Sequence, residues 1–204
     1  MNKQKFMKSL SAMTGWRETA FILALAERAL PNLDLYLGST ERSCLDEVLY
    51  PDGFESVMSQ SWHYAIMKPA EEPAIELLDT LNDVLDLLAE DENYGALPSR
   101  DCCQLWEQAL VSSLNQEKKR SAECSQASLT TITDFIEFSE GENLSDNDLV
   151  KLFDSHPLVE REFSFQAELC EMLRSAKHPS KELMEQVREL ANDEGISSIG
   201  ISLS

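Results

Sequence analysis

The chain has 204 residues, of which 43% are hydrophobic and 26% charged. This is enough to bury a core, and we expect one domain over residues 1–204. Its 37 acidic and 17 basic residues give a formal net charge of −20. Such a charge repels nucleic-acid phosphates and anionic lipid surfaces, so we expect neither nucleic acid nor a membrane as a partner.

Glycine and proline divide the chain into segments with helical periodicity. Thr14 is expected to cap the first predicted helix, which runs through Ala29. Pro31 is expected to begin a short helix that ends near residue 37. Further helices are predicted at residues 41–49 and after Asp52, which is expected to cap the next segment.

The next predicted helix, which Pro73 begins, has an acidic side. Residues 71–92 contain nine carboxylates and no Lys or Arg. Five of them recur at steps of three and four, which places them on one helix face: Glu76, Asp79, Asp83, Asp86 and Glu90. The opposite face is predicted to be apolar and to face the core, with Ala74, Leu78, Leu81, Leu85 and Leu88.

The second half of the chain is also predicted to be helical, except for its last residues, which are predicted to be extended. Ser99 is expected to cap one helix, a long helix is predicted over residues 118–139, and Ser145 fits a capping box with Asp148. Pro157 and Pro179 are each expected to begin a helix. Residues 199–203 then alternate apolar with small or polar residues, which indicates an extended tail. We expect the tail to dock on its own bundle rather than to pair with another copy. The predicted fold class is all-α: a compact bundle of about eight to ten helices with a short extended C-terminal tail.

The sequence contains no motif that indicates catalysis or a metal site. No His has a Glu three residues before it, as a di-iron bundle requires, and the P-loop and nucleophile-elbow patterns do not occur. We therefore predict no catalytic residue, no metal and no cofactor. The five cysteines show no C-x-x-C spacing, which favours reduced thiols in a cytoplasmic protein: Cys44, Cys102, Cys103, Cys124 and Cys170.

Several polar residues interrupt otherwise apolar helices and could line a pocket. They are Glu27, Arg28, Thr130, Thr131 and His156. Each also has an ordinary structural explanation. Arg28 suits a helix C-terminus, hydroxyls bond back to the preceding turn, and His156 precedes a helix-initiating proline.

Four segments resemble the YjaG-like family of uncharacterised bacterial proteins, a domain of unknown function. They are residues 16–32 (WRETAFILALAERALPN), 128–138 (SLTTITDFIEF), 156–169 (HPLVEREFSFQAEL) and 198–201 (SIGI). The resemblance implies a compact helical, cytoplasmic protein and assigns no activity. It draws attention to Trp16, Glu27, Arg28, Asn32, Thr130, Thr131 and Glu160, without a role for any of them.

Two functional hypotheses follow. The first is a non-enzymatic cytoplasmic interaction or regulatory protein whose acidic helix face binds a basic protein surface. The alternative is a small-molecule-binding protein or enzyme with a polar pocket between helices. The sequence makes no prediction of the oligomeric state.

Overall fold

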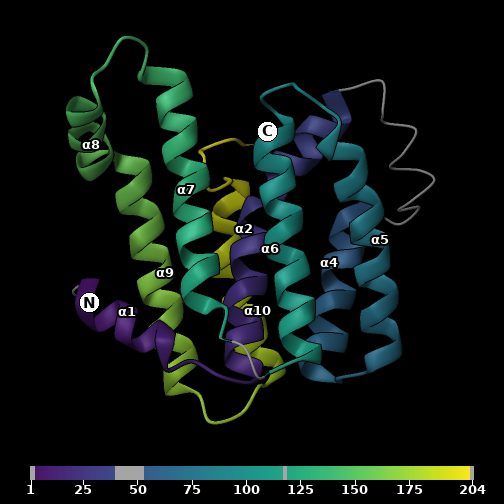
Figure 1. The fold of residues 1–204 in the computed structure, drawn as a ribbon. Helices are drawn as coiled ribbons and strands as arrows, with labels where there is room; N and C mark the ends of the chain where they lie inside the picture. Colours follow the sequence, from purple (N-terminus) through teal and green to yellow (C-terminus); the bar gives the residue numbers. More distant parts are fainter. Residues whose placement is uncertain (1–2, 40–52, 117–118, 203–204) are drawn as a thin grey trace.

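The structure, a computed structural model, describes residues 3–39, 53–116 and 119–202. Figure 1 shows an all-helical bundle, so the predicted fold class is confirmed. In chain order its α-helices are α1 (Lys3–Ser11), α2 (Trp16–Ser39), α4 (Gly53–Trp62), α5 (Glu71–Ala89), α6 (Ala96–Leu114), α7 (Ser121–Glu140), α8 (Asp146–Ser155), α9 (Pro157–Ser175) and α10 (Lys181–Asn192). A π-helical turn (His63–Met67) extends α4, and a 3-10 turn (Asp193–Gly195) follows α10. The helix predicted at residues 41–49, the Asp52 cap and Cys44 lie outside the described residues.

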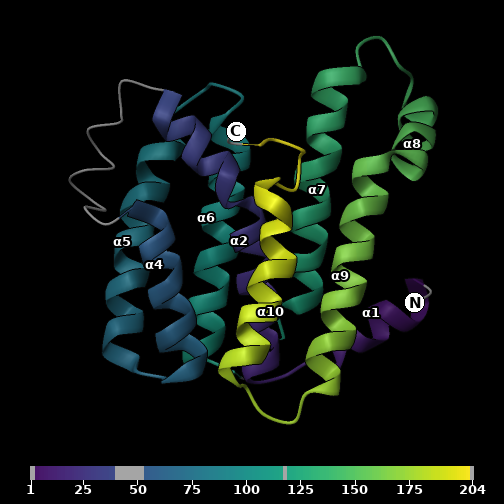
Figure 2. The ribbon, with the colours of Figure 1, turned by 180° about the vertical axis from the view of Figure 1, so that it is seen from behind.

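Helix α2 is the centre of the bundle. Residues 20–26 form a run in which every side chain is buried, as expected for a helix that is apolar on all sides. Figure 1 shows α6 and α7 in front of it, and Figure 2 shows α10 covering it from behind. None of the described helices is long and apolar enough to cross a membrane.

The prediction that Pro31 begins a helix is wrong, because α2 continues through it to Ser39. Leu33 and Leu37 beyond the proline are buried, and this burial outweighs the lost backbone hydrogen bond. Figure 2 shows the later part of α2 inclined to its first part. Near the proline, the carbonyl of Arg28 accepts a hydrogen bond from the backbone N–H of Ser198, at 3.2 Å.

The predicted helix starts agree with the structure in part. Ser145 accepts a hydrogen bond from the backbone N–H of Asp148, and Pro157 is the first residue of α9, as predicted. Ser99, by contrast, is not a cap, because α6 already begins at Ala96. Its hydroxyl instead donates to the carbonyl of Gly95 one turn earlier, at 2.8 Å.

Three further starts are shifted by a few residues. Helix α7 begins at Ser121 rather than at residue 118. Ser180, not Pro179, caps α10 by accepting the N–H of Leu183. Pro73 lies in the first turn of α5, two residues after its start at Glu71. The first turn of a helix tolerates proline because its N–H groups have no partner within the helix.

Helix α5 exposes its acidic face and buries an apolar one. The five predicted carboxylates are all exposed. The buried face is rotated slightly from the prediction and consists of Ala74, Leu77, Leu81, Val84 and Leu88. Leu78 and Leu85 lie beside it, partly buried against the core.

The C-terminal tail docks on its own bundle, as predicted. Ile199 is 3% exposed and packs with Ile132 and Ile136 of α7. The tail is a tight loop rather than a straight strand, and an antiparallel bridge joins Ile196 to Ser202.

Candidate functional site

The five predicted pocket residues do not line one pocket. Glu27 and Arg28 are neighbours on α2, but successive residues of a helix point about 100° apart. Thr130 and Thr131 lie on α7, and His156 lies between α8 and α9. Thr130 and Thr131 line one cavity together.

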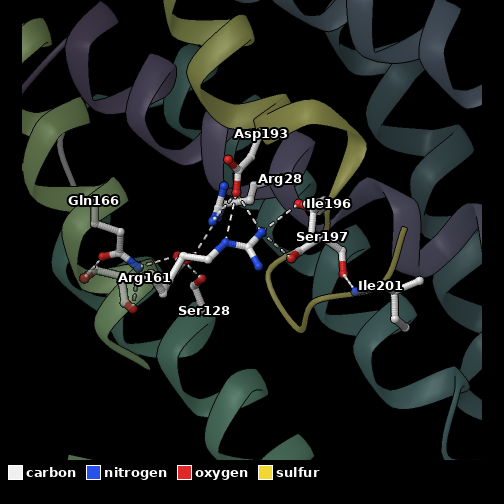
Figure 3. Close-up of polar contacts among 10 residues, drawn as sticks. Arg28, Ser128, Arg161, Gln166, Asp193, Ile196, Ser197 and Ile201 are labelled. Atoms are coloured by element: carbon white, nitrogen blue, oxygen red, sulfur yellow. Dashed lines mark hydrogen bonds and ion pairs between the residues drawn. The ribbon is translucent and has the colours of Figure 1, made fainter. Parts of the chain in front are cut away.

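Arg28 is the centre of a charge network, shown in Figure 3, that is buried at Arg28 and Glu162 and partly exposed at Asp193 and Arg161. Its Nε lies 2.9 Å from Oε2 of Glu162, and the two side chains are 2% and 1% exposed. Its Nη2 lies 3.1 Å from Oδ2 of Asp193, which also pairs with Arg161 at 2.7 Å. The other oxygen of Glu162 accepts hydrogen bonds from Ser128 and Gln166. Every charge here has a partner, so the network joins α2, α7, α9 and the turn after α10.

Glu27 faces a different side of α2. Its Oε1 accepts a hydrogen bond from Nε of Arg188, and its Oε2 accepts one from the indole of Trp62, each at 2.8 Å. Burial raises the pKa of Glu27, although both partners act in the opposite direction. These bonds tie α2 to α10 and α4, which is a structural role.

His156 is the N-cap of α9. Its Nδ1 accepts the backbone N–H of Leu158 at 3.2 Å, and its Nε2 lies 3.2 Å from Oε1 of Glu140. The side chain therefore fixes the junction of α8 and α9 and lies apart from the threonines.

The cavity that contains Thr130 and Thr131 is a groove between α6 and α7, which run antiparallel and side by side in Figure 1. Its volume is about 550 Å³. Four carboxylates, from Asp101, Glu107, Glu123 and Asp134, lie among its lining residues together with three glutamine amides, and no Lys or Arg is among them. We call this the acidic groove. It offers hydrogen-bond acceptors and negative charge, which suit a cation that carries N–H donors.

One end of the acidic groove has polar and aromatic groups in contact. The hydroxyl of Thr131 donates to Oδ2 of Asp101 at 2.8 Å. Burial raises the pKa of Asp101, and the charge of Asp134 acts in the same direction. Burial, assisted by these two carboxylates, raises the pKa of Tyr94 to about 12. The Tyr94 ring stacks on Phe138 with centroids 3.8 Å apart, and Phe138 is 64% exposed.

The two threonines of this groove are among the residues predicted from the sequence, and none of its acids is. Asp101, Gln104 and Gln108 recur at steps of three and four on α6, and Glu123, Thr130 and Asp134 follow the helical step on α7. Two polar stripes on consecutive antiparallel helices are a signal that could have indicated a shared polar groove.

Two other features bear on chemistry. In the described ranges, no three His, Cys, Asp or Glu side chains are grouped so that they could hold a metal ion. Burial raises the pKa of Cys102, and it raises those of Cys103 and Cys124 to about 12. A nucleophilic cysteine needs a lowered pKa, so these thiols are unsuited to that role.

The five carboxylates of the α5 face form no ion pair with any residue that the structure describes. Their charge is therefore fully available to solvent or to a partner.

Asn32 is 3% exposed, and its side-chain amide finds no hydrogen-bond partner among the described residues. It lies one turn beyond Arg28 on α2, and its backbone carbonyl accepts the hydroxyl of Ser99 at 3.2 Å.

Comparison with known proteins places the chain among bacterial relatives without an assigned role. A family model described as "Protein of unknown function (DUF416)" matches residues 5–202. The chain is 25% identical to an uncharacterised protein of Haemophilus influenzae, with 95% of each chain covered. It is 24% identical to the uncharacterised protein YjaG of Escherichia coli, with 94% of this chain and 93% of that one covered. The resemblance to the YjaG-like family is thus confirmed.

A solved structure has the same fold. The crystal structure of a DUF416 family protein from Shewanella baltica superposes with a TM-score of 0.80 and covers 97% of this chain and 98% of that chain. The two sequences are 24% identical, so this likeness shows the fold alone.

Proposed function

Because this chain belongs to the DUF416 family, whose function is unknown, we propose from its geometry that it is a non-catalytic cytoplasmic binding protein for a positively charged ligand. The proposed site is the acidic groove. The observation that carries the proposal is the meeting of four carboxylates in one concavity with no basic residue in its lining. Charges in a partly enclosed groove interact with a ligand more strongly than charges on an open surface, because less water screens them.

The groove also suggests the kind of cation. Its volume of about 550 Å³ suits a small molecule or a few side chains of a peptide. Glutamine and threonine oxygens between the carboxylates can accept hydrogen bonds from ammonium or guanidinium groups. A bare metal ion is a poorer fit, since no set of metal ligands converges among the described residues.

The proposal can be tested with spermine, a linear polyamine, as the probe. Isothermal titration calorimetry at low salt would compare the parent chain with the double variant Asp101→Asn/Asp134→Asn. The matched control is Asp83→Asn/Asp86→Asn on α5, which removes the same charge from an exposed face. We expect the groove variant to bind at least about tenfold more weakly, or about 1.4 kcal/mol, and the control to change affinity by less than about threefold.

Equal losses of affinity in the two double variants would mean that spermine binding depends on net charge alone, which would reject the site. The absence of spermine binding to the parent chain would reject it as well. Raising the salt concentration should weaken the specific interaction, because screening reduces attraction between charges.

The acidic face of α5 supports a second candidate function, docking of a basic protein surface. The observation in its favour is that Glu76, Asp79, Asp83, Asp86 and Glu90 are all exposed and form no ion pair with a described residue. Reversing Asp79, Asp83 and Asp86 to Lys should remove salt-sensitive partners from a low-salt pull-down. Identical partner lists for the variant and the parent would reject this function.

A further inference from the structure

The C-terminal segment 196–202, which we call the C-terminal plug, holds its own shape. The backbone N–H of Ser197 donates to the carbonyl of Ile201 at 2.8 Å, and that of Gly200 donates to the carbonyl of Ser197 at 3.0 Å. The N–H of Ile201 donates to the hydroxyl of Ser197 at 3.1 Å. These bonds lie within the segment, so they can persist if the plug leaves its place on the bundle.

The plug fills a socket that is separate from the main core. Ile199 packs with Ile132 and Ile136, and this cluster includes partly buried side chains of α7, α8, α9 and the plug: Phe135, Leu152, Phe153, Leu158, Val159 and Ile201. Removing the plug would expose this apolar surface without opening the main core around α2.

Backbone contacts hold the plug in the socket. Arg161 donates from Nη2 to the carbonyl oxygens of Ile196 and Ser197, at 3.1 and 3.0 Å (Figure 3). The N–H of Ser198 donates to the Arg28 carbonyl, as described above. These interactions use backbone atoms of the plug, so any copy of the segment in the same position would make them.

The hinge between α10 and the plug has an unfavourable backbone conformation. Asp193, Glu194 and Gly195 have φ angles of 43°, 58° and 79° in succession. Glu194 is strained in this left-handed region because its Cβ atom crowds the backbone, whereas glycine and aspartate adopt it more readily. The three residues turn the chain sharply back onto its own bundle, and an extended hinge would relieve the strain at Glu194.

We propose that the plug is exchanged between two copies of this chain. In the exchanged pair the hinge extends, and each chain's plug enters the socket of the other. A self-contained segment, a socket that it already fits and a strained hinge all favour such an exchange. The contacts of Ile199 and the bonds from Arg161 to the plug carbonyls form equally in either arrangement. The left-handed hinge and the ion pairs of Asp193 with Arg28 and Arg161 belong to the closed monomer.

The charge of the chain sets the conditions for exchange. Two chains that each carry a net charge of −20 repel one another at low ionic strength. Salt screens this repulsion and leaves the apolar contacts of the socket intact. The exchanged dimer should therefore form at high salt and high protein concentration.

A variant that lacks Glu194 and Gly195 tests the exchange, because its shortened hinge cannot reverse the chain and its plug can reach only another molecule. Size-exclusion chromatography with light scattering should show this variant as a dimer. Hydrogen exchange should show residues 197–201 as protected in the dimer as in the parent monomer. Adding Ile199→Asp, which cannot enter the apolar socket, should return the shortened chain to a monomer.

A milder variant tests the same hinge without shortening it. Glu194→Gly removes the side chain that strains the closed hinge and should reduce the dimer fraction of the full-length chain at high salt by about threefold or more. A shortened chain that remains monomeric would overturn the exchange, as would one that dimerises equally well with Ile199→Asp. An unchanged dimer fraction in Glu194→Gly would show that hinge strain does not favour exchange.

Discussion

The carboxylate of Glu18 on α2 caps the N-terminus of α7, where its Oε1 lies 2.9 Å from the backbone N of Ser121. The same oxygen accepts the backbone N–H of Arg120 and the hydroxyl of Ser121, and Glu18 is 1% exposed. The N-cap residue of α7, Arg120, provides no side-chain cap of its own. A buried carboxylate from another helix thus satisfies the first N–H groups of α7 and interacts favourably with its dipole.

Replacing Glu18 with Gln should lower the free energy of unfolding by about 1–3 kcal/mol, because one buried charged acceptor serves three donors. Urea denaturation monitored by circular dichroism would measure the change. Glu123→Gln, in the exposed first turn of α7, is the control and should remain within about 0.5 kcal/mol of the parent. Equal effects of the two substitutions would contradict the capping role.

Replacing Arg28 with Met should be more destabilising, by about 3–5 kcal/mol, because it leaves Glu162 buried without its counter-charge. Adding Glu162→Gln should recover part of this loss, since no unpaired carboxylate would then remain. Lys151→Met breaks an exposed ion pair with Asp148 and should change stability by less than about 1 kcal/mol. Additive losses in the Arg28 and Glu162 double variant would show that the pair is not coupled.

The pH dependence of the free energy of unfolding should show the effect of the raised pKa of Glu27. Burial raises its pKa above 4.5, so the folded chain retains this proton at pH values where the unfolded chain has released it. The free energy of unfolding must then fall as pH rises from below 4.5 through the raised pKa. Urea denaturation midpoints measured as a function of pH would show this fall, and Glu27→Gln should make the same part of the profile flatter.

Asp148, whose pKa is shifted in the opposite direction to that of Glu27, provides the comparison. The hydrogen bonds from Lys151 and Ser145 lower the pKa of Asp148, so its contribution is present above 3.8 and is lost as pH falls through the lowered pKa. Asp148→Asn should leave the fall assigned to Glu27 unchanged. A parent profile and a Glu27→Gln profile with the same slope above pH 4.5 would reject the assignment.

Replacing Asn32 with Leu should raise the free energy of unfolding by about 1–2 kcal/mol. Its buried amide has no partner among the described residues, and an unsatisfied buried polar group carries a desolvation cost. Asn and Leu side chains have the same number of heavy atoms, so steric strain should be small. Thermal and urea unfolding would check the change, and a loss of more than about 1 kcal/mol would show that the amide is satisfied in solution.

The buried thiols should resist alkylation while the chain is folded. At mildly alkaline pH, Cys103 and Cys124, with pKa values raised to about 12, carry almost no thiolate, and Cys102 is shifted in the same direction. Iodoacetamide followed by peptide mass spectrometry should label all three rapidly in urea and slowly in buffer. Rapid labelling of Cys124 in the folded chain would show that its buried thiol becomes exposed at the acidic groove.

Local patterns predicted the elements well where one physical requirement dominates. The alternation of leucine and carboxylate on α5 fixed its buried and exposed sides, and the Ser145 cap follows from a local hydrogen bond. Pro31 is an exception, because the burial of Leu33 and Leu37 that keeps α2 continuous depends on the whole bundle, which no local pattern contains.

The sites were harder to predict for the same reason. Nothing local to Arg28 indicates that Glu162, on a distant helix, neutralises it, or that Glu27 beside it faces Arg188 instead. The acidic groove exists because α6 and α7 lie side by side, so its acids become a set only after the chain has folded.

The proline in α2 and the docked tail act on the same turn of the helix. Pro31 has no N–H to donate to the carbonyl of Glu27 four residues earlier, and the next carbonyl, that of Arg28, accepts the N–H of Ser198 from the tail. A chain truncated before Ser198 would lose this donor in the turn that the proline already weakens, whereas alanine at position 31 would restore the backbone bond to Glu27 and strengthen the same turn from within. Loss of the tail should therefore be better tolerated once the proline is gone, a dependence between the two ends of the polypeptide that related sequences would show as joint change.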